Sequence, residues 1–398
     1  MPTPQSPPHS RREIFFATCA PGIEPLLHAE IEALGLAKVE RQVGGVHFEG
    51  TLGDAWRANL WLRTAVRVLW RLARFGARDA DELYAGLQTV DWSRFIQPSG
   101  SLRVSAHVNE SELDHALFVE QRTKDAIADQ FREKAGERPS VERDSPDLCV
   151  YVHIYKDRCT VFADTSGESL HKRGWRRFQG RAPLSETLGA ACVLASGWDR
   201  RAPLIDPFCG SGTILIEGLL IAANIAPGTL GRSFGFERWL GHDARAWQAA
   251  LELARSKTRM PAKLVVRGYD VDRAVIAGAL ENLSAAGLEG RILLERARVE
   301  DFAPKRGWNA WIVTNPPYGE RIGDEDQLHA LFRHFGETLR TQAAGYQLGL
   351  LSGNTRLTRA LGLTPERKLS WKNGSIDCQF LSYTLGTKTL QAQDDERT

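Results

Sequence analysis

Residues 203–218 read PLIDPFCGSGTILIEG, which predicts an apolar strand, a glycine-containing turn and an apolar helix in direct succession. This unit begins a doubly wound α/β sheet, in which ligands bind at the carboxyl ends of parallel strands. Gly210 and Gly212 would let the backbone turn sharply and approach a ligand closely. The GSGT spacing differs from G-x-x-x-x-G-K-[ST], which excludes a P-loop triphosphate site. The alternative is a glycine turn with no ligand.

The acidic residue at the tip of the strand, Asp206, indicates the charge of the ligand. A carboxylate would repel a pyrophosphate, whereas it suits the cationic aminoacyl end of S-adenosylmethionine, so we expect this cofactor. The next strand ends in GYDVD (268–272), where Asp270 is placed to accept both ribose hydroxyls and Asp272 to cap the following helix. In RARVEDF (296–302), Asp301 is the acid available to an adenine edge, with Arg298 as a competitor for that position. The predicted cofactor-binding residues are Asp206, Phe208, Cys209, Gly210, Ser211, Gly212, Thr213, Asp270, Val271 and Asp301.

The second informative stretch is WNAWIVTNPPYG (308–319), a strand that ends in two prolines. An exocyclic amine is a poor nucleophile because its lone pair is delocalised into the ring. The Asn315 side-chain oxygen and the Pro316 carbonyl could hold its two hydrogens and favour the pyramidal form. Pro317 stiffens the turn, and Tyr318 offers a stacking face worth about 1–3 kcal/mol. We predict methyl transfer to an amine at these four residues, where adenine N6, cytosine N4, guanine N2 and a glutamine amide are all suitable acceptors; a base in a duplex would have to flip out.

The pattern of elements divides the chain into two folded regions. Residues 13–165 mix strands with amphipathic helices, including an expected helix over 54–75 and a hairpin over 148–165 that turns at Lys156 and Asp157. Residues 185–388 alternate strands and helices, with Ser185 as the first helix cap. A basic linker is expected over 166–184, a disordered tail over 1–12 and a polar tail over 389–398.

The amino-acid composition limits the classes of protein to which the chain can belong. The 398 residues are 42% hydrophobic and 25% charged, which is typical of a globular protein with a large core. A net charge of +2 argues neither for nor against nucleic acid. The 6 cysteines show no C-x-x-C pair or zinc spacing, so we expect no metal and a reducing, cytoplasmic location. No apolar run of about 18 residues predicts a membrane span, and the N-terminus has no secretory h-region.

Two basic segments are candidate RNA contacts. On a helix over 54–75, four arginines would form one stripe: Arg63, Arg67, Arg71 and Arg74. The alternative is a solvated helix face. In the linker, cations interleave with Trp175 and Phe178, a composition suited to unpaired RNA, with an interdomain brace as the alternative. The linker residues predicted to contact RNA are Lys172, Arg173 and Arg176.

Five blocks together resemble the THUMP-domain RNA methyltransferases: ADTSGESLHKRGWR, APLSETLGAA, DPFCGSGTILIEG, TNPPYGERIG and KNGSIDC. The likeness spans about residues 14–385 and is greatest to the N-terminal, guanine-N2 half of the bifunctional bacterial 23S ribosomal RNA methyltransferase. It implies a ferredoxin-like segment over 13–53 and a THUMP RNA-binding domain over 54–165. A Rossmann-like, seven-stranded, mostly parallel class I methyltransferase domain is implied over 185–388.

The resemblance further implies S-adenosylmethionine-dependent methylation of guanine N2 in 23S ribosomal RNA or its assembly intermediate, with Lys372 and Asn373 of KNGSIDC at the RNA. Members are often labelled N6-adenine DNA methylases because they share N-P-P-Y. Two departures from the family are expected: the residues given include no counterpart of the 7-methylguanine half, and Arg298 stands where related sequences usually have an adenine-binding aspartate. Alternatives are guanine-N2 methylation of transfer RNA, N6-adenine methylation of DNA or RNA, and a non-catalytic RNA-binding assembly factor.

Overall fold

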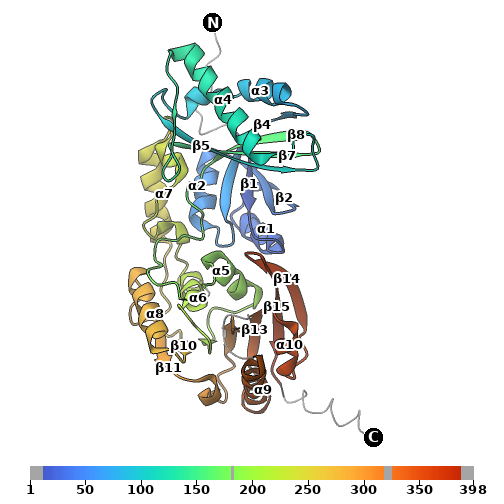
Figure 1. Ribbon diagram of the computed structural model, residues 1–398. Helices are drawn as coiled ribbons and strands as arrows, with labels where there is room; N and C mark the ends of the chain where they lie inside the picture. Colours follow the sequence, from blue (N-terminus) through green and yellow to red (C-terminus); the bar gives the residue numbers. More distant parts are fainter. Residues whose placement is uncertain (1–11, 181–182, 318–324, 387–398) are drawn as a thin grey trace. The chain divides into compact units, whose positions relative to one another are not determined.

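The computed structural model describes residues 12–180, 183–317 and 325–386 (Figure 1). The chain divides into two compact units. The first comprises Met1–Cys19, Leu27–Leu170 and Arg232–Leu253, and the second comprises Ala20–Leu26, His171–Gly231 and Ala254–Thr398. Across the described ranges, no helix combines the length and apolar character needed to cross a membrane.

The first unit is built on an eight-stranded sheet with the order β2-β3-β1-β4-β8-β7-β5-β6. Neighbouring strands are antiparallel except for β5, which runs parallel to β7 and β6. The elements of the N-terminal region are β1 (Glu13–Thr18), α1 (Glu24–Ala33), β2 (Ala37–Gln42), β3 (Gly45–Gly50), α2 (Leu52–Trp61), β4 (Arg67–Gly76), α3 (Ala80–Gln88), η1 (Trp92–Arg94), β5 (Ser101–Asn109), α4 (Ala116–Ala135), β6 (Ser140–Val141), β7 (Leu148–Tyr155) and β8 (Arg158–Asp164).

The predicted helix over 54–75 is wrong. Helix α2 ends at Trp61, and the chain continues as strand β4 between β1 and β8. The helix stops because Leu62 is extended (φ −68°, ψ 124°) and the backbone N–H groups of Arg63 and Thr64 donate to the Glu30 carboxylate at 2.8 and 3.0 Å. The arginine spacing was compatible with either structure, and partners distant in sequence decided between them.

The predicted hairpin over 148–165 is confirmed. Strands β7 and β8 pair antiparallel and meet at Lys156 and Asp157. These two residues have φ values of 49° and 57°. Positive φ at both central positions is the signature of a type I′ turn, whose twist matches that of the flanking strands.

The second unit is built on a seven-stranded sheet with the order β11-β10-β9-β12-β13-β15-β14. Its first five strands are parallel, and β15 is antiparallel to both β13 and β14, which confirms the predicted mostly parallel sheet. The elements along residues 186–384 are α5 (Glu186–Ala195), β9 (Leu204–Asp206), α6 (Thr213–Ala222), η2 (Pro227–Thr229), η3 (Gly235–Arg238), α7 (Ala244–Ser256), β10 (Val266–Asp270), α8 (Arg273–Ala285), β11 (Leu293–Arg296), η4 (Val299–Asp301), β12 (Trp311–Thr314), α9 (Glu325–Gln342), β13 (Gln347–Ser352), α10 (Thr355–Ala360), β14 (Arg367–Asn373) and β15 (Ile376–Thr384).

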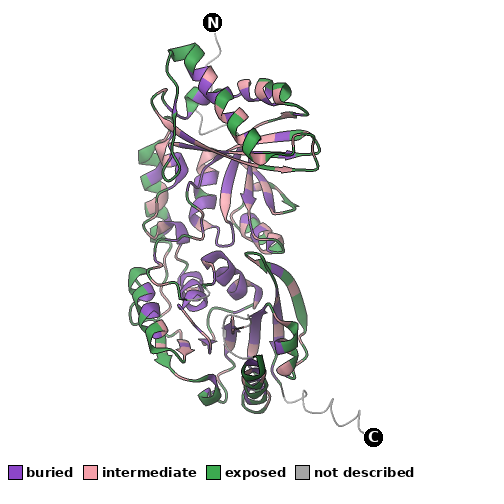
Figure 2. Ribbon diagram, in the orientation of Figure 1, coloured by how far each residue is buried: buried purple, intermediate pink, exposed green. Residues whose placement is uncertain are grey.

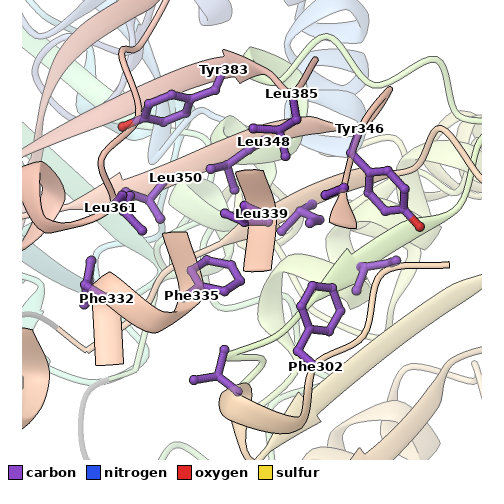
Figure 3. Packing of buried hydrophobic residues seen from close by; sticks show 14 of the residues in the cluster. Phe302, Phe332, Phe335, Leu339, Tyr346, Leu348, Leu350, Leu361, Tyr383 and Leu385 are labelled. Carbon is purple, nitrogen blue, oxygen red and sulfur yellow. The ribbon is translucent and has the colours of Figure 1, made fainter. Parts of the chain in front are cut away.

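The core of the second unit fixes the loop that follows β9. Phe335 and Leu339 of α9 pack with Leu348 and other buried residues of the sheet (Figure 3). Phe208, in the loop, packs against this cluster. Its ring lies edge-on to that of Phe335, with 5.4 Å between the two ring centroids. Helices α5 and α6 are buried along most of their length (Figure 2). The loop is therefore held between a rigid sheet and two covered helices.

Candidate cofactor and substrate site

The two sequence motifs meet at the carboxyl ends of neighbouring strands. Strands β9 and β12 pair in parallel, with Leu204 opposite Trp311 and Ile205 opposite Ile312. The Thr314 hydroxyl donates to Asp206 Oδ1 at 2.5 Å, across 108 residues of sequence. The strand tip of the glycine loop and the start of the N-P-P segment therefore share one hydrogen-bonded site.

The glycine loop is tied to the neighbouring strand β10. Gly210 and Gly212 have φ values of 51° and 81°, in the left-handed region that favours glycine. The Gly210 N–H donates to Asp270 Oδ2 at 3.2 Å, and the Cys209 N–H donates to the Tyr269 carbonyl at 2.9 Å. Asp272 caps α8 through the Ala274 N–H, as predicted. Asp270 thus faces the loop from the end of β10.

Asp206 and Asp270 form an acidic site. Burial raises the pKa of Asp206 to about 7, although hydrogen bonds from Thr314 and from the Phe208 N–H oppose this shift. The charge of Asp270 adds to the rise, and burial raises the pKa of Asp270 as well. Two adjacent carboxyl groups that are costly to ionise fit a ligand that brings positive charge, and they do not fit a pyrophosphate.

The raised Asp206 pKa predicts a pH-dependent stability. The pKa of Asp206 is higher in the folded chain than in the unfolded chain. The contribution of protonated Asp206 to the free energy of unfolding is therefore complete below about pH 4 and is lost as the pH rises through about 7. Asp206→Asn should remove that loss and stabilise the cofactor-free chain at pH 8 by up to about 4 kcal/mol relative to wild type, with little gain at pH 4. Urea unfolding at both pH values measures the difference. The control is Asp272→Asn, and an Asp206→Asn gain that is the same at both pH values would contradict the prediction.

Sequence reasoning missed the residue that braces the loop. Arg176, predicted as an RNA contact, donates to the hydroxyls of Ser211 and Thr213 at 3.0 and 2.9 Å. Its guanidinium also donates to Glu186 Oε1 at 2.7 Å and to the Leu184 carbonyl at 2.8 Å. The planar five-donor group can serve four acceptors at once. Arg176 therefore holds the cofactor loop from within its own unit.

Asn282 makes a second connection that the sequence analysis did not identify. Its Oδ1 accepts from the N–H groups of Arg177 and Phe178, at 2.7 and 2.9 Å. Its amide nitrogen donates to the carbonyls of Phe178 and Ser211, at 2.8 and 3.0 Å. In the sequence, Asn282 could have been recognised as a polar residue at a position where the other buried residues of α8 are apolar or glycine. The side chain joins the linker, the loop and α8.

Removing the Arg176 brace should weaken cofactor binding. Arg176→Ala deletes four charge-assisted hydrogen bonds around the loop, so we expect the dissociation constant for S-adenosylhomocysteine to rise about 10- to 100-fold. Arg176→Lys should not restore binding, because one ammonium cannot reach all four acceptors. Isothermal calorimetry measures the affinity, with the exposed neighbour Arg177 changed to alanine as control. Wild-type affinity in Arg176→Ala would contradict the brace.

Asn315 is the residue predicted to hold the acceptor amine. Its Oδ1 atom is buried and has no hydrogen-bond donor among the described residues. Pro316, which follows it, is buried, and Pro317 is half-buried. The predicted stacking residue Tyr318 lies outside the described residues. A buried amide oxygen without a donor is costly, so this atom fits the predicted role of accepting from a bound group.

The remaining predicted residues lie as follows. Val271 is exposed after β10, and Asp301 is exposed in η4. Arg298 pairs with Glu300 at 3.2 Å on the surface, and Lys372 pairs with Asp377 at 3.4 Å across the β14–β15 hairpin that also contains Asn373. The roles of Asp301, Lys372 and Asn373 stay predictions, as does that of Lys172, which is exposed.

Three arginines predicted to contact RNA are buried or pair with a carboxylate inside the fold. Arg63, which follows α2, is buried, and Arg67 pairs with Asp164 at 2.5 Å. Arg173 is buried against Glu217 at 3.3 Å. The surface stripe proposed for the first two is wrong because it required a helix that the chain does not form.

The fold and the site define a Rossmann-like methyltransferase preceded by an α+β region. The RMKL-like methyltransferase domain matches residues 173–382, and the chain belongs to this family. The RlmL ferredoxin-like domain matches residues 14–69, and the THUMP domain matches residues 77–164.

Known proteins share most of this chain. The Ribosomal RNA large subunit methyltransferase K/L of Methylococcus capsulatus (Bath) is 44% identical over 380 residues, which is 93% of this chain and 51% of that protein. The chain thus spans about half the length of the curated relatives it matches. The crystal structure of SMU.472 complexed with SAH is 30% identical, covers 94% of this chain and 99% of that one, and has a TM-score of 0.86. A predicted N6-adenine-specific DNA methylase from Listeria monocytogenes is 31% identical, with coverages of 94% and 97% and a TM-score of 0.84.

Proposed function

We propose that this chain transfers a methyl group from S-adenosylmethionine to the exocyclic N2 amine of a guanine in 23S ribosomal RNA. The observation that carries the chemistry is the buried Asn315 Oδ1, which has no donor among the described residues and follows the Thr314 that binds Asp206. The RNA class is supported by the THUMP match and by the name of the Methylococcus relative. The choice of guanine N2 rests on the resemblance of the motif blocks.

The residues around Asp206 fit the cofactor. When bound, S-adenosylmethionine supplies an electrophilic methyl group on a sulfonium. Asp206 and Asp270 offer negative charge to its cationic groups, and Asp270 is also the acceptor available to ribose hydroxyls. The left-handed turns at Gly210 and Gly212 keep side chains out of the approach, while Arg176 and Asn282 fix the loop.

The N-P-P segment orients the amine. Asn315 Oδ1 and the Pro316 carbonyl accept the two amine hydrogens and direct the lone pair away from the base ring. In the transfer the nitrogen would gain a bond to the methyl carbon while the carbon–sulfur bond breaks and its electron pair stays on sulfur as a neutral thioether. The nitrogen would then lose one proton, for which these acceptors provide the first hydrogen-bonded path. Neither group is strongly basic, so the rate gain comes from positioning and from stabilising charge on the amine.

Nucleoside mass spectrometry tests the function. Large-subunit RNA from cells with and without the gene is digested, and we expect loss of N2-methylguanosine at one site. Loss of the modification from transfer RNA, or of N6-methyladenine from DNA, would redirect the proposal to those substrates. Calorimetric titration of the pure protein with S-adenosylmethionine separates the non-catalytic alternative, which predicts no binding.

A further inference from the structure

One face of the eight-stranded sheet carries aromatic and basic side chains that the described chain leaves half-exposed or exposed. On the opposite face, Phe15, Trp70, Val150 and Ala163 are buried. Because successive side chains alternate between faces, the intervening positions form one surface. We call this surface the sheet platform; it comprises Phe16, His47, Arg71, Arg103, His107, Tyr151, His153 and Phe162.

Strand register arranges the platform in rows. Arg71 of β4 lies opposite Phe162 of β8, which lies opposite Tyr151 of β7. One row further along β7, His153 lies opposite His107 of β5. Adjacent strands are about 4.8 Å apart, and successive rows are about 7 Å apart along a strand. That row spacing is about twice the 3.4 Å rise of a duplex strand, so it suits bases that are splayed from a single strand.

The rings of the platform lie close to one another while remaining accessible. The Phe16 and Phe162 centroids are 6.4 Å apart, and the His107 and His153 rings stack at 5.7 Å with an angle of 7° between their planes. Both histidines are exposed, and both phenylalanines are half-buried. Tyr151 is half-buried as well, and the Arg67 guanidinium lies over its ring at 5.3 Å from the centroid, which leaves the other ring face for a base. Aromatic rings on an uncovered sheet face offer flat surfaces on which unpaired bases can stack.

One cation of the platform, Arg71, has no direct carboxylate partner in the part of the chain that the structure describes. Its side chain is half-buried and makes no ion pair or hydrogen bond among the described residues. Burial and the nearby Arg74 lower the pKa of Arg71, and burial and Arg71 lower that of His47. Glu40 lies opposite His47 on this face, and Glu49 pairs with Lys38 at 2.9 Å; both charges oppose the fall in the pKa of His47. A bound anion would relieve this repulsion between cations.

We propose that the sheet platform binds an unpaired stretch of RNA, with bases stacked on Phe162 and Tyr151 and a phosphate at Arg71. This proposal rests on the proposed function, since it adds a second contact to the same class of substrate. Rings beside a guanidinium that has no direct ion pair among the described residues suit a strand of bases and phosphates. A protein partner would be expected to bring carboxylates for Arg71 and no preference for single strands.

Fluorescence anisotropy tests the platform. The probes are a labelled single-stranded oligouridylate of about 12 nucleotides and a hairpin of equal length. We expect Phe162→Leu, which keeps an apolar side chain but removes the ring, and Tyr151→Ala each to weaken single-strand binding about tenfold. Arg71→Ala should lower the slope of log affinity against log salt by about 0.7. Phe118→Ala is the matched control, because Phe118 is an exposed phenylalanine on α4 of the same unit.

Further outcomes separate the platform from the proposed function. Wild-type affinity in Phe162→Leu/Tyr151→Ala, with an unchanged thermal transition, would overturn the platform, as would 4-thiouridine cross-links confined to peptides outside β4, β7 and β8. If wild type binds RNA through the platform but transfers no methyl group to 23S RNA, the proposed function fails and the platform stands. If wild type methylates and the double variant binds and methylates equally well, the platform fails alone.

Discussion

Asn315→Ala is expected to reduce methyl transfer by at least about 10²–10³-fold while leaving the affinity for S-adenosylmethionine within about twofold of wild type. The substitution removes Asn315 Oδ1, a buried acceptor that has no donor among the described residues. Loss of a single preorganised polar group that acts on the reacting atoms commonly has an effect of this size. Asp206, Asp270 and the glycine loop are untouched, so cofactor binding should persist. Isotope incorporation from labelled cofactor into 23S RNA measures the rate, and calorimetry measures the affinity.

A matched variant separates chemistry from folding. Asn354 lies in the same unit, and its side-chain oxygen caps α10 by accepting from the N–H groups of Arg356 and Leu357. Asn354→Ala should lower stability by about 1 kcal/mol, as expected for a lost cap, and keep methyl transfer. Full incorporation by Asn315→Ala, or equal losses in both asparagine variants, would sink the assignment of Asn315 to the reacting amine.

Arg173→Ala is expected to destabilise the second unit by about 3–5 kcal/mol. Arg173 and Glu217 are 2% and 0% exposed, and their side chains meet at 3.3 Å. Removing one partner leaves the other charge buried without its compensating ion, and this desolvation is far more costly than the loss of a surface contact. Thermal and urea unfolding followed by circular dichroism would report the change, with a fall in melting temperature of about 6–20 °C.

Two comparisons make this expectation specific. Arg173→Met/Glu217→Met removes both charges and should be less destabilising than Arg173→Ala alone. Arg356→Ala breaks the exposed pair with Glu325, whose side chains are 71% and 60% exposed and 2.7 Å apart, and should change stability by less than about 1 kcal/mol. If Arg173→Ala lowers the free energy of unfolding no more than Arg356→Ala does, the buried ion pair does not have the predicted importance for stability.

The predicted and observed structures differ most at the two arginine segments. The alternation in β4 was masked because Arg67, Arg71 and Arg74 also fit a helical spacing. In the linker, Arg173 and Arg176 looked like a surface patch, yet their carboxylate partners Glu217 and Glu186 draw both inward. Spacing along the chain gives no information about which carboxylate will fold against a cation.

The sequence by itself determined the features that depend on neighbouring residues. These include the hairpin turn at Lys156 and Asp157, the caps at Ser185 and Asp272, and the tight turn of the glycine loop. Local backbone preference and side-chain capping act within about four residues, so they can be read directly. The tertiary structure alone decided that Glu30 ends α2, that Arg176 braces the loop and that Thr314 binds Asp206. Those contacts join residues about 30 to 110 positions apart, and only burial of the common core brings such partners together.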